Sequence, residues 1–151
     1  MICNPTNFYK HVQTFMKQYT ISSENDMITL GEELAKHHTI ILLEGELGAG
    51  KTTFTKGFAK GLQLKQTTIQ SPTYTYLNIY EDKLLHIDMY RLQSIQELTE
   101  KGILDQINQF DYIIIERPKF IEQLSFKEYI HLTIKKTSPT SREVTVIHHQ
   151  K

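Results

Sequence analysis

The hydrophobic positions near the start of the chain follow a helical period and then a strand pattern. Apolar residues recur at helical spacing over residues 8–19, which predicts an amphipathic helix. Ser23, followed three residues later by Asp26, forms a capping box that predicts a second helix ending near His37. The apolar, β-branched run 39–44 is typical of a strand buried on both faces.

The middle of the chain again predicts a helix followed by strands. Apolar residues every fourth position predict a helix from Phe54 to a stop near Gly61, and a short strand is expected to end at Ile69. Two extended segments, 73–80 and 84–90, are separated by a polar turn and predict a hairpin.

The last third predicts one more helix and three more strands. Ser94 and Glu97 form a second capping box, which opens a helix that Gly102 can close. A buried strand is expected over 111–115, ending at Glu116, and a terminal hairpin over 129–135 and 142–147. Helices that alternate with apolar strands predict a three-layer α/β fold, with a parallel central sheet and added antiparallel hairpins.

Length and composition narrow the possible class of protein. The 151 residues suit a single domain, 1–151, in which residues 1–19 form an N-terminal extension. Seventeen basic residues balance seventeen acidic ones, so no net charge draws the protein onto nucleic acid or anionic lipid. The sole cysteine, Cys3, excludes a disulfide framework. With no stretch of membrane-helix length and no signal-peptide layout, we expect a soluble, cytoplasmic protein without membrane contact.

The segment 45–52 carries the most specific chemistry. It reads Gly-Glu-Leu-Gly-Ala-Gly-Lys-Thr and matches the phosphate-binding pattern G-x-x-x-x-G-K-[ST] between a predicted strand and a predicted helix. Its glycines let backbone N–H groups approach phosphate oxygens, and the helix directs its positive end at the same place. Lys51 can bridge the β- and γ-phosphates, and the Thr52 hydroxyl can ligate Mg²⁺. The motif predicts a P-loop NTPase-like fold that binds a nucleoside triphosphate with Mg²⁺.

Two carboxylates are candidates to act beside the phosphates. Glu116 directly follows a predicted buried strand, at the end where open α/β sheets bind ligands. Asp88 shares one face of its strand with His86, which could orient it. Either acid could ligate Mg²⁺ or orient the attacking water. The plainer alternatives are a strand-end charge for Glu116 and a solvent-facing hairpin residue for Asp88.

Five blocks of the chain resemble the TsaE (YjeE) family, over residues 22–147. In order, they are the glycine loop 45–53, the Ser-Pro-Thr-Tyr segment 71–74, the His-Ile-Asp-Met-Tyr-Arg segment 86–91, Glu97-Leu98 before Gly102, and Ile115-Glu116. The resemblance implies a small ATPase of tRNA threonylcarbamoyladenosine synthesis that hydrolyses ATP weakly alone and associates with TsaD and TsaB. Contact with tRNA would be only indirect, through that complex.

The resemblance also implies roles for individual residues. Thr52 and Glu116 would be Mg²⁺ ligands, Lys51, Asp88 and Glu116 would be catalytic, and 71–73 would sense the nucleotide state. The nucleotide site would be formed by Glu24, Glu46, Leu47, Gly48, Ala49, Gly50, Lys51, Thr52, Thr53 and Arg142. One departure is Arg117, where the family usually has Trp; it could offer charge to phosphate or a partner, or be a solvated arginine.

Other functions are weighed against this one. A GTPase is disfavoured because the nearest match to the guanine-binding N-K-x-D block, at 108–111, lacks the lysine. A small-molecule kinase of the P-loop class is the main rival, although only three arginines and no long lid insertion are present. A nucleotide-gated binding module without significant turnover stays open. The adjacent histidine pairs, 37–38 and 148–149, lack metal-ligand spacing and are expected to be surface residues.

Overall fold

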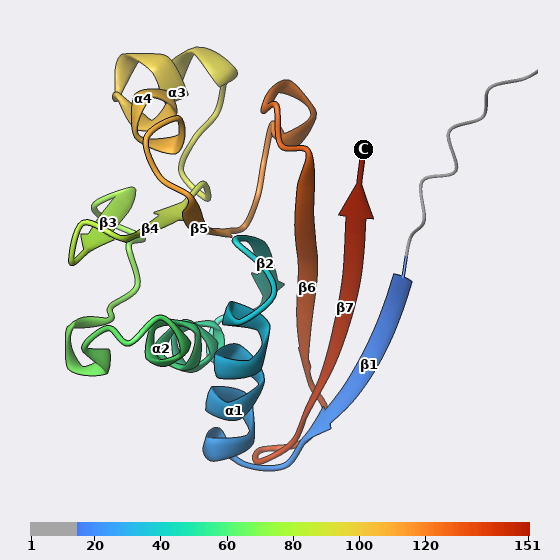
Figure 1. Cartoon of the computed structure of the whole chain (residues 1–151). Coiled ribbons are helices and arrows are strands. Elements are labelled where there is room, and N and C mark those ends of the chain that lie inside the picture. The colour runs from blue at the N-terminus through green and yellow to red at the C-terminus, as the bar shows by residue number, and fades with distance from the viewer. Residues whose placement is uncertain (1–14) are drawn as a thin grey trace, which may run out of the picture.

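A single mixed sheet organises residues 15–151, the part of the chain that the structure, a computed structural model, describes (Figure 1). Its seven strands lie in the order β1-β7-β6-β2-β5-β4-β3. The strands are β1 (Phe15–Ile21), β2 (Ile40–Gly45), β3 (Leu77–Tyr80), β4 (Leu84–Asp88), β5 (Tyr112–Glu116), β6 (Glu128–Lys136) and β7 (Arg142–Gln150).

The centre of this sheet is parallel and its edges are antiparallel. β2 pairs in parallel with both β5 and β6, and β5 pairs in parallel with β4. The hairpins β3–β4 and β6–β7 add the antiparallel strands, and β1 pairs with β7. The sheet therefore confirms the predicted parallel centre with added hairpins.

Helices cover both faces of the sheet, as Figure 1 shows. They are α1 (Glu24–Ala35), α2 (Lys51–Gly61), α3 (Ile95–Glu100) and α4 (Ile103–Ile107), with single 3₁₀ turns η1 (Gln66–Thr68) and η2 (Ile121–Gln123). None of these helices has the length and apolarity needed to cross a membrane.

Successive residues of the central strands point to opposite faces and build two cores. Leu43 and Ile114 pack in the cluster that includes α1 and α2. Leu42, Ile113 and Ile115 pack in the cluster that includes α3 and α4. This explains why β2 and β5 are apolar at nearly every position, and it confirms the three-layer α/β class.

The helix predicted over residues 8–19 is wrong where it can be compared. Residues 15–19 belong to β1, and 8–14 lie outside the described residues. Phe15 and Met16 are 62% and 66% exposed, so their apolar spacing does not mark a buried helical face. The backbone instead completes its hydrogen bonds in a ladder with β7, from Phe15↔His148 to Ile21↔Arg142.

The segments around the short helices also differ from expectation. The strand expected to end at Ile69 is the 3₁₀ turn η1, and the strand expected over 73–80 begins only at Leu77. Ser94 is the N-cap residue of α3, but its side chain makes no capping hydrogen bond. Gly102, with φ 71°, ends α3 and begins α4, a helix that the sequence pattern did not predict. By contrast, Ser23 caps α1 as predicted, accepting from the Asp26 amide at 3.1 Å.

Candidate functional site

The glycine loop lies between the C-terminal end of β2 and the first turn of α2. Gly48 and Gly50 have φ of 78° and 115°, a region that favours glycine, and Gly50 is the N-cap residue of α2. A Cβ at Gly45 would lie 3.0 Å from the Ile134 carbonyl oxygen of β6. The loop thus curls tightly at the positive end of a helix, which favours the binding of anions.

Lys51 is buried at the mouth of this loop. Its ammonium Nζ donates to the carbonyl oxygens of Gly45 at 2.6 Å and Glu46 at 3.0 Å. Burial lowers the pKa of Lys51, and the nearby Glu116 carboxylate opposes that shift. An ammonium that binds only neutral carbonyls gains much more from anionic phosphate oxygens.

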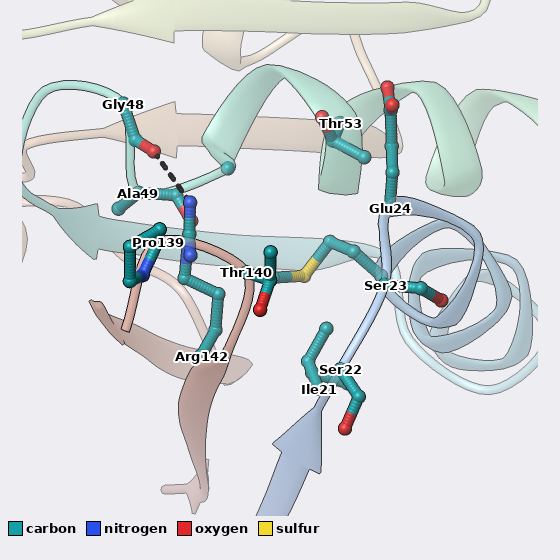
Figure 2. Close-up of a pocket in the computed structure, with 12 residues that line it drawn as sticks. Ile21, Ser22, Ser23, Glu24, Gly48, Ala49, Thr53, Pro139, Thr140 and Arg142 are labelled. Atoms are coloured by element: carbon teal, nitrogen blue, oxygen red, sulfur yellow. Dashed lines mark hydrogen bonds between the residues drawn. The ribbon is translucent and has the colours of Figure 1, made fainter. Parts of the chain in front are cut away.

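Two cavities open on either side of the loop and share Gly48, Gly50 and Thr53. The first has a volume of about 280 Å³ and is lined by Leu47, Gly48, Gly50, Lys51, Thr52, Thr53, Ser71, Thr73, Glu116 and Arg117. The second, about 410 Å³ and drawn in Figure 2, is lined by Ile21, Ser22, Ser23, Glu24, Met27, Gly48, Ala49, Gly50, Thr53, Pro139, Thr140 and Arg142. The two cavities therefore adjoin at the start of α2.

Arg142 connects the loop to the terminal hairpin. Its Nε donates to the Ala49 carbonyl at 2.7 Å and its Nη2 to the Gly48 carbonyl at 3.2 Å, the contact dashed in Figure 2. Its Nη1 donates to the carbonyls of Ser138 and Ser141. Arg142 lines the second cavity, and its guanidinium holds the loop in shape, while its role in nucleotide binding stays a prediction.

Glu116 and His86 form a buried pair on neighbouring strands. Glu116, at the end of β5, is 1% exposed, and its Oε1 lies 2.8 Å from Nε2 of the fully buried His86. The suggestion that His86 orients Asp88 is therefore wrong, because its hydrogen bond goes to Glu116. His86 orients a carboxylate that also lines the first cavity.

Asp88 lies behind the residues that line the first cavity. It is 1% exposed and does not line either cavity. Its Oδ1 accepts from the Tyr90 amide at 2.9 Å, its Oδ2 accepts from the Thr73 hydroxyl at 3.0 Å, and the Arg117 guanidinium binds both oxygens. Asp88 can reach a bound phosphate or water only after the contacts with Thr73 and Arg117 rearrange.

Arg117 makes contacts beside the first cavity that the sequence did not predict. It follows Glu116 with φ 48°, and its guanidinium stacks 4.3 Å from the Tyr90 ring centroid while it binds Asp88 and the Thr73 hydroxyl. The alternative of a solvated side chain is therefore wrong, whereas a contact with phosphate or a partner stays a prediction, since Arg117 also lines the first cavity. An arginine directly after the strand-end acid was the available signal, but its partner is 29 residues away in the sequence.

The remaining predicted residues, apart from Glu46, line one or both of the two cavities. Thr52 shares the first cavity with Glu116, and Glu24 faces the second. Leu47 stands almost fully exposed at the rim, and Glu46 lines neither cavity but accepts hydrogen bonds through its carbonyl. A hydroxyl and a carboxylate in one cavity are the hard oxygen donors that Mg²⁺ prefers. The donor set therefore fits a magnesium-bound polyphosphate.

Comparisons with known proteins give the family of the chain. Residues 21–144 match the family model of "Threonylcarbamoyl adenosine biosynthesis protein TsaE". The tRNA threonylcarbamoyladenosine biosynthesis protein TsaE of Bacillus subtilis is 34% identical over 135 residues, covering 86% of this chain and 84% of that protein. Its namesake from Aquifex aeolicus is 44% identical over 98 residues, covering 59% of this chain and 74% of that protein.

A solved structure extends the likeness to the fold. The crystal structure of Bacillus subtilis YdiB superposes with a TM-score of 0.65 at 27% identity, covering 89% of this chain and 86% of that chain. The family match spans strands β2 to β6, the glycine loop and both candidate carboxylates. The chain belongs to the TsaE family of threonylcarbamoyl adenosine biosynthesis proteins.

Proposed function

We propose that this protein binds ATP with Mg²⁺, hydrolyses it slowly by itself, and acts on a TsaD–TsaB complex during tRNA threonylcarbamoyladenosine synthesis. The observation that carries the proposal is the position of the Lys51 ammonium, which is buried at the loop mouth and, within residues 15–151, binds only backbone carbonyls. Loop amides, Lys51, Thr52 and Glu116 converge on one cavity, as recognition of a metal-bound triphosphate requires.

The second cavity suits the nucleoside end of the ligand. Its lining includes the apolar residues Ile21 and Met27, which would suit a base, and the polar residues Ser22, Ser23 and Glu24. Because it shares Gly48, Gly50 and Thr53 with the first cavity, one ligand can extend across both. This division supports a nucleoside triphosphate over inorganic phosphate.

Each polar residue then has a chemical task. Lys51 neutralises charge that develops on the terminal phosphates, and Glu116 and Thr52 would hold Mg²⁺, which supplies electrostatic stabilisation of the phosphates when bound. The His86 contact keeps the Glu116 carboxylate aimed into the cavity. Asp88, once released by Arg117, would accept a hydrogen bond from the attacking water.

The arginines support slow turnover in isolation. All three fall within the described residues, and each is hydrogen-bonded to its own chain: Arg91 to the carbonyls of Thr73 and Tyr74, Arg117 to Asp88, and Arg142 to the loop. An arginine that closes onto the transferred phosphoryl group can raise turnover by about 10³–10⁵-fold. Without one, the site is poorly suited to rapid hydrolysis or to the kinase alternative.

Binding of Mg-ATP is expected to stabilise the fold. At a hundredfold excess over Kd the gain is about 2.7 kcal/mol, which for a chain of this size corresponds to a rise of about 5–10 °C in melting temperature. Thermal unfolding monitored by circular dichroism measures it. ATP with a metal chelator should give a smaller shift and GTP a still smaller one; no shift at millimolar Mg-ATP would contradict the proposal.

The partner assignment needs a separate assay. Phosphate release by the isolated protein should be slow, and addition of purified TsaD and TsaB should change the rate several-fold. A kinase would instead respond to a small phosphate acceptor. A rate that the two subunits leave unchanged, with no complex in analytical ultracentrifugation in the presence of ATP, would refute the partner assignment while leaving the nucleotide site intact.

A further inference from the structure

Two histidines and a glutamate meet at the end of the sheet opposite the glycine loop. His38 lies in the turn between α1 and β2, Glu128 is the first residue of β6, and His148 lies near the end of β7. One potential ligand atom from each lies within 4.8 Å of the other two. His148 Nε2 and Glu128 Oε1 are 2.5 Å apart, and the rings of His38 and His148 meet edge to face with centroids 5.4 Å apart.

The backbone holds these three residues in place. Ile130 pairs with His148 and Glu128 with Gln150, so Glu128 and His148 are diagonal neighbours on one face of the β6–β7 ladder. That face carries Ile130 into the core cluster beneath α1. The His38 amide donates to the Leu34 carbonyl at 2.9 Å, which fixes the turn after α1 against the same face.

The surroundings suit a metal ion with an open coordination position. A cavity of about 100 Å³ lies beside the cluster and is lined by His37, His38, Thr39, Ile40, Glu128 and Tyr129. This space is large enough for a water molecule.

We propose that His38, Glu128 and His148 form a binding site for a divalent transition metal ion of the zinc class. Two imidazoles and a carboxylate with a water in the fourth position are a common ligand set for Zn²⁺. Two nitrogen donors disfavour Mg²⁺, which takes oxygen ligands. Ligand atoms of a tetrahedral zinc site lie about 3.3 Å apart, so the three side chains need only small rotations, and the ion would take the place of the hydrogen bond between Glu128 and His148.

This site is separate from the nucleotide site. His38 precedes β2 and the glycine loop follows it, so the length of that six-residue strand, roughly 20 Å, separates the two. Bound metal would tie the turn before β2 to β7, which is distant in the sequence. The inference does not depend on the proposed ATPase function, and it concerns a second cation with different ligand chemistry.

The test uses the full chain with any affinity tag removed, in excess Mg²⁺ to occupy oxygen-rich sites. Zn²⁺ affinity and stoichiometry are measured by competition with a chromophoric chelator, and Co²⁺ absorption reports tetrahedral coordination. We expect one zinc ion per chain and a raised melting temperature. His38→Gln and His148→Gln should each weaken binding by more than about 100-fold, the upper end of the loss from removing an outer hydrogen-bond partner of a metal ligand.

His149 supplies a matched control for His148. It faces the other side of β7, where it stacks on Tyr129 at 4.8 Å. His149→Gln should keep the wild-type zinc affinity. Glu128→Gln, at an exposed position where folding is not at risk, should also weaken binding. Absence of a stoichiometric zinc ion, or equal affinities in the ligand and control variants, would overturn the proposal.

Discussion

Asp88→Asn is expected to lower ATP turnover by about 10²–10⁴-fold, the usual contribution of a positioned general base, while Mg-ATP affinity stays within about threefold. The amide keeps the size of the carboxylate and can still accept from the Tyr90 amide. It loses the charge that pairs with Arg117 and the basicity needed to accept a proton from water. Single-turnover kinetics, together with a binding isotherm, separate the two effects.

A matched substitution tests whether this loss is local. Asp105 lies exposed on α4, and Asp105→Asn should leave both turnover and affinity at the wild-type level. If Asp88→Asn keeps more than about a tenth of the wild-type turnover, Asp88 does not act as the base. Equal losses in affinity and turnover would instead assign Asp88 a structural role in holding Thr73 and Arg117.

Lys51→Ala is expected to abolish most of the stabilisation by Mg-ATP. A loss of at least 100-fold in affinity reduces the gain at a fixed ligand concentration from about 2.7 kcal/mol to less than about 0.5 kcal/mol. The loop amides remain, but the buried ammonium that would meet the phosphates is gone. Melting temperatures with and without nucleotide measure the effect.

The nucleotide-free form of this variant should remain folded. Burial of the Lys51 ammonium against neutral carbonyls is unfavourable, as the lowered pKa of that group indicates, so its removal costs the empty protein little. Lys60→Ala, at the exposed end of α2, is the matched control and should respond to Mg-ATP like the wild type. A Lys51→Ala variant that keeps the full shift would place the triphosphate elsewhere.

The local sequence predicted those helices and strands whose hydrophobic pattern fits only one type of secondary structure. β2 and β5 were expected within one residue of their observed ends, because an apolar run of this length buried on both faces has few alternatives. The terminal hairpin and the capped start of α1 were found for similar local reasons. At β1 the same reasoning failed, because sparse apolar positions fit both periods and pairing with the distant β7 decided between them.

The candidate site likewise has one part that the local sequence predicts and another part that forms only when distant segments meet. Residues 45–52 specify their own phosphate-binding geometry, because one short stretch supplies the positive-φ glycines, the lysine and the helix start. The contacts that complete the site join distant segments: Arg142 to Ala49 across 93 residues, Glu116 to His86 across 30, and Arg117 to Asp88 across 29.

The histidines show most clearly that spacing in the sequence does not reveal contacts between distant segments. As two adjacent pairs in the sequence they had no metal-ligand spacing, and the cluster takes one histidine from each pair, His38 and His148, together with Glu128. What the sequence alone determined was therefore the family, the layered α/β architecture and the phosphate loop, because each depends on short-range pattern. The order and register of the strands decided which distant side chains meet, since those contacts exist only after the sheet has assembled.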